Sequence, residues 1–192
     1  NGSNFEWVRW EWAISHPYTD PTQLDKIGLW ETENDDVVAM ATYENRLGDT
    51  FLITDPAYYH LREEMLEYAL VNLCNEEGKI RLYINNNDRE LQLLARKHGL
   101  HPTQDKDIDS VIEVTDEISY TLPDGFSIIS MADECDYAKI HDVMWKGFDH
   151  GDDVPQTPEE HEMRRILFSG PSQSHDLKIM TKAPNGEYCS FC

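Results

Sequence analysis

Apolar runs separated by turn residues predict a β-hairpin at two places in the chain. The first covers residues 26–41, with apolar positions on both sides of an Asn-Asp pair at residues 34–35. The second covers residues 178–192 and surrounds a Pro-Asn-Gly turn at residues 184–186. Turn residues between two apolar runs are the short-range signal for a hairpin. Two such hairpins at domain-sized spacing indicate two copies of one fold.

Helical and strand patterns account for the rest of the first copy. A Ser-Asn-Phe-Glu sequence at residues 3–6 resembles a capping box, and an Asp-Pro pair at residues 55–56 marks a second helix start. Gly78 and Gly99 stand where two helices are expected to end. The expected elements are helices over residues 3–15, 56–77 and 88–98 and strands over residues 50–53, 79–84 and 110–114.

The second copy begins after a turn-rich joint at residues 120–125, which is the expected domain boundary. A strand over residues 126–130 and helices over residues 134–148 and 157–170 precede the second hairpin. A polar loop at residues 149–156 joins the two helices. The residues expected to face inward from the first of these helices are Ile140, Val143, Met144 and Phe148.

Strands that alternate with helices, together with hairpins, predict an α/β fold with a mixed sheet, of the α+β kind. The expected domains are residues 1–119, which lack an opening strand and helix, and residues 120–192, which form the first half of a second domain. The aromatic residues of the helix over residues 3–15 cover most of its circumference. They form either an aromatic ligand pocket or a helix wedged between a sheet and a neighbouring element.

Composition disfavours anionic partners. The 192 residues include 37 acidic and 16 basic ones, a formal net charge of −21. Such a surface repels phosphate, so nucleic acid and anionic membranes are not expected partners, whereas cationic amines are. Solubility alone is an alternative reason for the same charge. No apolar run approaches the ~20 residues of a membrane span, and no signal peptide is evident, so a cytoplasmic location is expected.

Candidate binding residues lie together in the loop at residues 149–156, and they are Asp149, His150, Asp152 and Asp153. Clustered carboxylates attract a cationic amine, and a nearby histidine relays its proton. The alternative is an exposed, solvated loop without a ligand.

The sequence predicts no metal site. Arg165 occupies the second histidine position of a potential H-E-x-x-H motif, and the aspartates of the loop lack the spacing of an EF-hand. Cys189 and Cys192 have C-x-x-C spacing, but metal and redox sites usually hold that spacing in a turn or at a helix start. These two cysteines fall on an expected strand, where positions three apart face opposite sides.

The element order resembles that of the GNAT acyltransferases, which transfer an acyl group from coenzyme A to an amine. The resemblance is carried by Leu-Trp at residues 29–30, Ile-Thr-Asp-Pro-Ala-Tyr at 53–58, Ala-Arg-Lys-His-Gly-Leu at 95–100 and Leu-Pro-Asp-Gly-Phe-Ser-Ile at 122–128. The pairing is similar to tandem GNAT proteins, whose first domain is often degenerate. It implies an N-acetyltransferase with acetyl-CoA as co-substrate and a small cationic amine as acceptor, which attacks the thioester directly.

The first copy departs from the family at two functional positions. Family members bind pyrophosphate with an Arg/Gln-x-x-Gly-x-Gly/Ala loop, whose bare backbone N–H groups face the anion. The resemblance places Tyr59 at the Arg/Gln position and Arg62 and Glu64 at the glycine positions. Ala95 stands where many members have a tyrosine that protonates the leaving thiolate. The first copy is therefore expected neither to bind coenzyme A nor to catalyse transfer.

Catalysis is then expected in the second copy, whose phosphate loop and tyrosine position would follow Cys192. For that reason the sequence identifies no catalytic and no cofactor-binding residue. One alternative is a non-catalytic GNAT-like module that binds a ligand or partner through its aromatic helix, and another is a chance likeness of two α/β pieces. An unfinished sheet would expose an edge at residues 188–192, and a homo-oligomer is one arrangement that covers such an edge.

Overall fold

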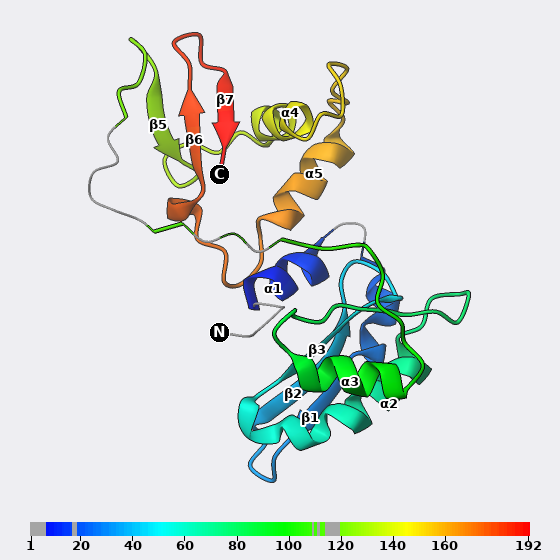
Figure 1. Cartoon of the computed structure of the whole chain (residues 1–192). Coiled ribbons are helices and arrows are strands. Elements are labelled where there is room, and N and C mark those ends of the chain that lie inside the picture. The colour runs from blue at the N-terminus through cyan, green and yellow to red at the C-terminus, as the bar shows by residue number, and fades with distance from the viewer. Residues whose placement is uncertain (1–6, 17–18, 109, 111, 114–119) are drawn as a thin grey trace. The chain divides into compact units, whose positions relative to one another are not determined.

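The computed structural model describes residues 7–16, 19–108, 110, 112–113 and 120–192, with side chains from Arg9 onward. The chain consists of two compact units, Asn1–Gln104 and Asp105–Cys192 (Figure 1). Each unit has its own sheet and its own hydrophobic core. The sequence places the domain boundary later, between residues 119 and 120.

The first unit contains a mixed four-stranded sheet. Its strands, in spatial order, are β1 (Gly28–Glu31), β2 (Val37–Tyr43), β3 (Asp49–Thr54) and β4 (Arg81–Leu82). The first three are antiparallel neighbours, whereas β4 pairs in parallel with β3. A parallel neighbour requires a crossover connection, which includes the helix α2 (Arg62–Asn72). The expected strand over residues 79–84 is shorter in the structure, because β4 pairs with β3 at only two positions.

The first unit's other helical elements are α1 (Trp7–Ser15), the 3-10 turns η1 (Pro21–Lys26) and η2 (Pro56–Leu61), and α3 (Arg89–Lys97). Aspartates cap three of these starts, because Asp20 accepts a hydrogen bond from the N–H of Thr22, Asp55 from that of Ala57 and Asp88 from that of Leu91. Helix α2 packs against β2. Six side chains in and next to α2 are expected inward from their spacing. Four of them are buried in this core, Met65, Leu66, Ala69 and Leu73, whereas Leu61 and Leu70 are partly buried against it.

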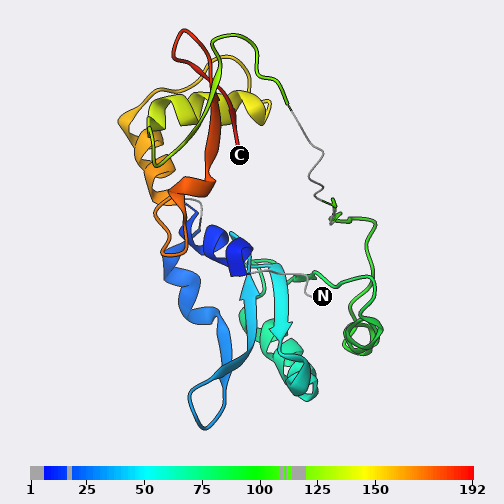
Figure 2. The ribbon, with the colours of Figure 1, turned by 90° about the vertical axis from the view of Figure 1, so that its left-hand side faces the viewer.

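The second unit contains a three-stranded antiparallel sheet. Its strands, in spatial order, are β5 (Ser127–Ser130), β6 (Ile179–Lys182) and β7 (Tyr188–Phe191). The connection from β5 to β6 contains the helices α4 (Tyr137–Gly147) and α5 (Pro158–Leu167) and the 3-10 turn η3 (His175–Leu177). Helix α4 packs against both β7 and α5 (Figure 2). Ile140 of α4 and Met180 of β6 are almost fully buried in this core.

The two hairpins have the same backbone register. Leu29 pairs with Met40 in the first hairpin and Met180 with Phe191 in the second, so the offset between the hairpins is 151 residues. In both, the register shifts by one residue next to the connection. The other matched pairs are Trp30–Ala39 with Thr181–Ser190, and Glu31–Val37 with Lys182–Tyr188.

Each hairpin turns through a five-residue connection with one set of hydrogen bonds. The N–H of Thr32 donates to the carbonyl of Asp36 (2.9 Å), and the N–H of Asp35 donates to that of Thr32 (3.1 Å). Residues 183–187 form the same two bonds, each 2.9 Å long. The fourth residue has a positive φ, +65° at Asp35 and +87° at Gly186. This is the geometry of a type I turn closed by a left-handed residue.

The same offset extends upstream of the hairpins. It relates the end of η1 to the end of η3, and each of these 3-10 turns follows a helix, α1 or α5. After the 3-10 turn, the N–H of Ile27 donates to the carbonyl of Leu24 (3.2 Å), and that of Lys178 donates to the carbonyl of His175 (3.4 Å). The two units therefore share a helix followed by a 3-10 turn and a hairpin, and the end of the 3-10 turn and the hairpin keep a constant spacing.

The shared hairpin buries opposite faces in the two units. Val37 is 55% exposed, whereas Tyr188 at the matched position is buried. Conversely, Ala39 is buried and its counterpart Ser190 is exposed. The reason is the helix that covers each sheet, because α2 packs on one face of the first hairpin and α4 packs on the other face of the second.

Three expectations about local structure are wrong. Phe148 is 68% exposed rather than inward, because α4 ends one residue before it. Gly78 has a positive φ, but it lies in a turn beyond the end of α2 rather than capping the helix. The described residues of the expected strand at 110–114, which are Ser110, Ile112 and Glu113, have no strand conformation. Residues 111 and 114 lie outside the described part.

Substitutions at the left-handed position should have opposite effects in the two hairpins. Gly186→Ala should lower the free energy of unfolding of the second unit by about 1–2 kcal/mol, because a Cβ disfavours positive φ. Asp35→Gly should raise that of the first unit by about 0.5–1 kcal/mol. Amide hydrogen exchange in the hairpin strands would measure both changes.

Gly147→Ala is the control for this pair of substitutions. Gly147 lies in α4 with an ordinary helical φ, and an added Cβ there meets no other atom within 4 Å. A loss of protection as large in Gly147→Ala as in Gly186→Ala would contradict the assignment of the effect to positive φ.

Candidate functional site

The residues expected to bind an amine lie directly after α4. Asp149, His150, Asp152 and Asp153 are all exposed. Lys146, in the last turn of α4, has a raised pKa, first because it donates to Asp142 (2.9 Å) and further because of the negative charges of Asp142 and Asp152. The structure thus brings one loop carboxylate into the field of a helix cation, which neutralises part of the loop's charge.

Two of the four residues complete the end of α4. The N–H of Asp149 donates to the carbonyl of Lys146 (3.0 Å), and that of His150 donates to the carbonyl of Trp145 (3.1 Å). Asp149 has a φ of +59°. Two such bonds around a left-handed residue form a Schellman motif, which usually includes a contact between the outermost residue and the helix. Here the His150 and Trp145 rings make that contact, with centroids 5.0 Å apart.

The loop therefore divides into a structural part and an open part. Asp149 and His150 satisfy the last carbonyls of α4 and pack on its final turn. Asp152 and Asp153 remain exposed carboxylates beyond that motif. Asp149 and His150 take part in the contacts that end α4. The side chains of Asp152 and Asp153 do not, so these two carboxylates can bind a cation without disturbing the helix end.

A buried histidine lies next to this loop. His141, in the middle of α4, is fully buried, and its Nδ1 accepts a hydrogen bond from Nε of Arg164 in α5 (3.1 Å). Because Nδ1 is the acceptor, the proton of the neutral ring is on Nε2. The Glu160 carboxylate is 3.9 Å from that Nε2, and the Trp145 ring centroid is 5.7 Å from that of His141.

Helix caps bring these side chains together. Asp136 accepts hydrogen bonds from the N–H groups of Ala138 and Lys139, which starts α4. Thr157 accepts one from the N–H of Glu160 (3.3 Å), which starts α5 with Glu160 in its first turn. Since α4 and α5 pack against each other, Glu160 and Arg164, four residues apart on α5, both reach His141.

Burial keeps His141 neutral. Its pKa is lowered, mainly by loss of hydration and then by the positive charge of Arg164, while Glu160 and the carbonyl of Pro155 act in the opposite direction. Nε1 of Trp145 is buried and makes no hydrogen bond within the described residues. A buried donor without a partner can bind a water molecule or a small polar group.

Sequence analysis identified none of the groups His141, Glu160, Arg164 and Trp145. Their signal was present in part, because His141 and Trp145 are four residues apart and so share a helix face with each other. A histidine between apolar neighbours at that spacing gives no indication of its partner. The partner comes from α5, whose approach depends on the tertiary packing.

In the first unit, Tyr59 and Arg62, which the GNAT resemblance places at phosphate-loop positions, make contacts of their own. The Arg62 guanidinium stacks on the Tyr59 ring, 3.5 Å from its centroid, and pairs with the Asp88 carboxylate at 2.8 and 3.1 Å. Both members of that pair are mostly buried. Bidentate pairs of this kind are specific and directional. The Arg62 guanidinium therefore already binds Asp88 within its own unit.

The start of α2 carries its own negative charge. Glu63 and Glu64 lie in its first turn, where an anion would otherwise interact with the helix dipole. Glu64 accepts a hydrogen bond from Nε1 of Trp30 (2.9 Å). Ala95, which the GNAT resemblance places at the tyrosine position, is buried.

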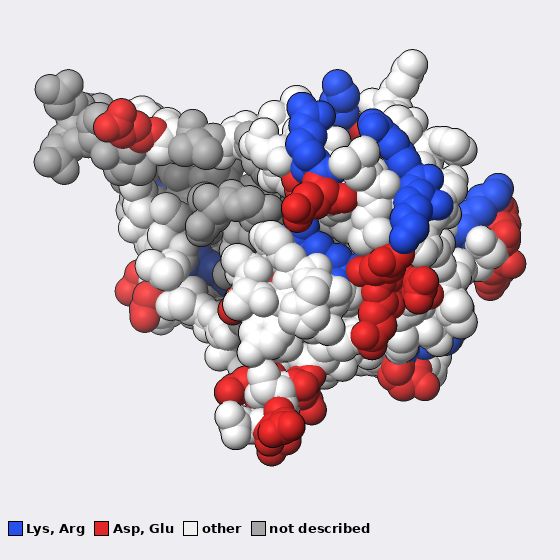
Figure 3. Space-filling model, turned by 60° about the horizontal axis from the view of Figure 1, so that its bottom comes forward, with Lys and Arg blue, Asp and Glu red and all other residues white. Residues whose placement is uncertain are grey.

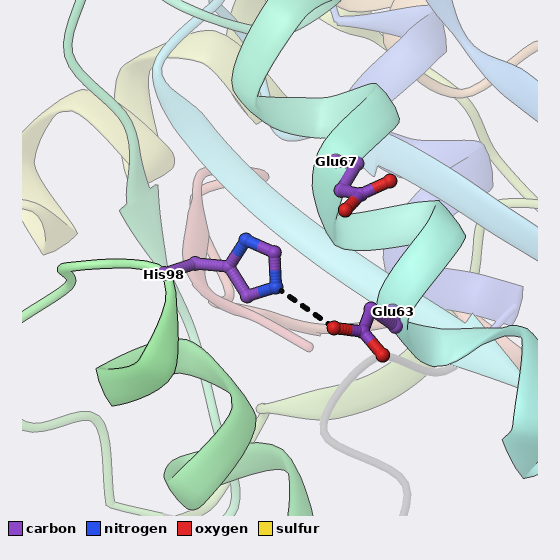
Figure 4. A group of neighbouring side chains, drawn as sticks. All are labelled: Glu63, Glu67 and His98. Carbon is purple, nitrogen blue, oxygen red and sulfur yellow. Dashed lines mark hydrogen bonds and ion pairs between the residues drawn. The ribbon is translucent and has the colours of Figure 1, made fainter.

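One group of potential metal ligands occurs among the described residues, although the sequence predicted none. Glu63 and Glu67 of α2 and His98, at the end of α3, each direct one ligand atom to a common region, with all three atoms within 4.8 Å of one another (Figure 4). Nε2 of His98 is 3.3 Å from the Glu63 carboxylate. The i,i+4 spacing of the two glutamates is visible in the sequence, whereas the position of His98 depends on α2 and α3 packing together.

Of the two C-x-x-C cysteines, Cys189 lies on β7 as the sequence predicted, whereas Cys192 directly follows that strand. Both are exposed. Cys74 and Cys135 are also free.

No protein-family model, curated protein or solved structure matches the chain. Among the described residues, no helix is both long and apolar enough to span a bilayer. The chemistry of these sites therefore follows from their geometry.

Asp149→Gly should stabilise the second unit. Glycine adopts the left-handed conformation at this position without strain, so the free energy of unfolding should rise by about 0.5–1 kcal/mol, measured by amide exchange in α4. Asp149→Asn is the matched control, because it removes the charge but keeps a side chain. An equal gain in both variants would attribute the effect to charge and contradict the backbone explanation.

Stability of the second unit should fall with acidification through His141. Because folding lowers the pKa of this histidine, the unfolded chain is protonated first as pH falls below about 6.5. The stabilising contribution of neutral His141 is complete above that pH and is lost as pH falls toward the lowered folded-state pKa. Protection of α4 amides, corrected for intrinsic exchange, should therefore be lower at pH 5.5 than at pH 7.5.

His141→Gln tests the assignment, because glutamine can accept from Arg164 but does not titrate in this range. The variant should lose most of the pH dependence, whereas His150→Gln, in the exposed loop, should retain it. An unchanged pH dependence in His141→Gln would show that another group is responsible.

Proposed function

We propose that the chain belongs to a tandem N-acyltransferase of the GNAT type, which transfers an acetyl or other acyl group from acyl-CoA to a small cationic amine. The first unit is a degenerate copy of the domain and the second is the first half of the catalytic copy. The remaining strands of that copy, with the phosphate loop, belong to the full-length protein.

The single observation that carries the proposal is the common backbone of the two units. A helix, a 3-10 turn and a hairpin recur in the same order, and the end of the 3-10 turn and the hairpin recur at one offset, with one register, one pair of connection hydrogen bonds and one left-handed residue. Independent folds seldom agree in all of these features at once. The likeness supports a duplicated domain.

The two units also complement each other. The second has a strand and helix, β5 and α4, before the shared part, and the first has β3, α2, β4 and α3 after it. Joined through the shared part, they give strand, two helices, hairpin, strand, helix, strand and helix, which supports the GNAT order. Their hairpins also bury opposite faces, as expected if α2 and α4 represent the two helical layers of one α/β domain.

Acceptor binding is assigned to the second unit. Asp152 and Asp153 present exposed carboxylates that attract a cationic amine over a distance. Asp149 and His150 hold the loop on α4, and the buried group around His141 supports its base. The amine arrives as an ammonium cation, which a carboxylate-rich entrance attracts. It must then lose a proton before the neutral amine attacks the thioester carbonyl.

Other properties follow from the same proposal. A cytoplasmic location matches the supply of acyl-CoA. Nucleic acid is not a partner, and on the face that Figure 3 shows, basic side chains lie beside acidic ones. The edge of β7, which pairs within its sheet only with β6, is covered by the following strand of the domain or by a second copy in a homo-oligomer. In this proposal the first unit does not catalyse transfer, and its aromatic helix can serve to bind a ligand or a partner.

Acyl-CoA titration tests the proposal. Isothermal titration of acetyl-CoA into the 192-residue chain should show no binding, because Glu63 and Glu64 carry negative charge at the start of α2, where a phosphate would bind. The full-length protein should bind one equivalent. In the full-length protein, neutralising Asp152 and Asp153 to asparagine should raise the KM for a cationic amine several-fold without changing that for acetyl-CoA. A full-length protein that binds no acyl-CoA would overturn the enzyme assignment.

Glu76→Gln with Glu77→Gln is the control for charge. These residues lie in an exposed turn of the first unit, and their loss changes the net charge by the same amount. An equal rise in KM would show that the overall charge, rather than the loop, attracts the amine.

A further inference from the structure

We propose that Glu63, Glu67 and His98 form a binding site for a divalent transition-metal ion, with Zn²⁺ as the representative ion. The site belongs to the first unit and is independent of the proposed acyl transfer.

The three ligand atoms converge from two elements. Glu63 and Glu67 lie one turn apart on α2 and project toward the His98 ring (Figure 4). Their ligand atoms lie within 4.8 Å of one another, so small side-chain rotations bring them to the ~2 Å bond lengths of zinc. Two carboxylates and an imidazole are three ligands, which leaves a fourth tetrahedral position for water.

The scaffold holds these ligands in place before an ion arrives. The buried Arg62–Asp88 pair joins the start of α2 to the start of α3. At the other end of α3, the N–H of Gly99 donates to the carbonyl of Arg96, and that of Leu100 donates to the carbonyl of Ala95. This Schellman motif fixes the backbone at His98, whose side chain is only 17% exposed.

The charge at this place favours a cation. Carboxylates at i,i+4 on a helix repel each other unless a positive charge lies between them. In the structure that charge is the Lys97 ammonium, which bonds to Glu63. The side chains at this place therefore already pair with one cation.

A metal ion would replace Lys97 at Glu63. The ammonium keeps its proton and moves into water, which requires little free energy because the Lys97–Glu63 pair is exposed and such pairs are weak. His98 must bind through an unprotonated nitrogen, so a protonated ring releases its proton to solvent. An imidazole among the ligands favours zinc, nickel or copper over magnesium and calcium.

Zn²⁺ titration of the 192-residue chain tests the site. The unmodified chain should bind one equivalent saturably, and Glu67→Gln or His98→Asn should weaken binding at least tenfold. Glu64→Gln and His101→Asn are matched controls on the same helix and the same segment, and they should bind as the unmodified chain does. Circular dichroism would verify that each variant is folded.

Lys97→Met gives a result that a purely structural ion pair does not produce. Removing a positive charge that competes for Glu63 and repels a divalent ion should tighten Zn²⁺ binding about tenfold. Co²⁺ should bind with d–d absorption and without thiolate charge transfer, which separates this site from Cys189 and Cys192. Absence of Zn²⁺ binding, equal affinity in all variants, or a thiolate band would overturn the proposal.

Discussion

Both sheets depend on a connection of five residues in which the fourth must adopt a positive φ. Asp35 fills this position in the first unit and Gly186 in the second. Once the chain turns there, the two hydrogen bonds of the connection determine which residues face each other on the flanking strands. The register then decides which side chains share a face of the hairpin. Which of the two faces enters the core depends on the covering helix, α2 in the first unit and α4 in the second.

The sequence allows the existence of most elements to be predicted, but not the alignment of the two copies. Lys26-Ile27 and Lys178-Ile179 match in letters at an offset of 152 residues, whereas the backbones match at 151. A shift of one residue exchanges the two faces of a strand. The helices α2 and α4 cover opposite faces, so similar apolar residues serve different positions in the two hairpins. Only the hydrogen bonds of the connection resolve this.

The candidate sites were predictable to different extents. The acidic loop was visible from its composition, but the αL conformation of Asp149 and the stacking of His150 on Trp145 arise from the way α4 ends. His141 gave no signal, because its partners belong to another helix. Glu63 and Glu67 have a readable spacing, yet His98 joins them only through the packing of α2 with α3. Sequence patterns report contacts within an element, and these sites are formed between elements.

The first turn of α2 has a thermodynamic consequence for the first unit. Its carboxylates, Glu63 and Glu64, are already bonded to Lys97 and Trp30 within the same unit. A site that is satisfied internally gains no linkage free energy from an external anion. Binding of an external anion at this helix start would therefore add nothing to the free energy of unfolding of the first unit.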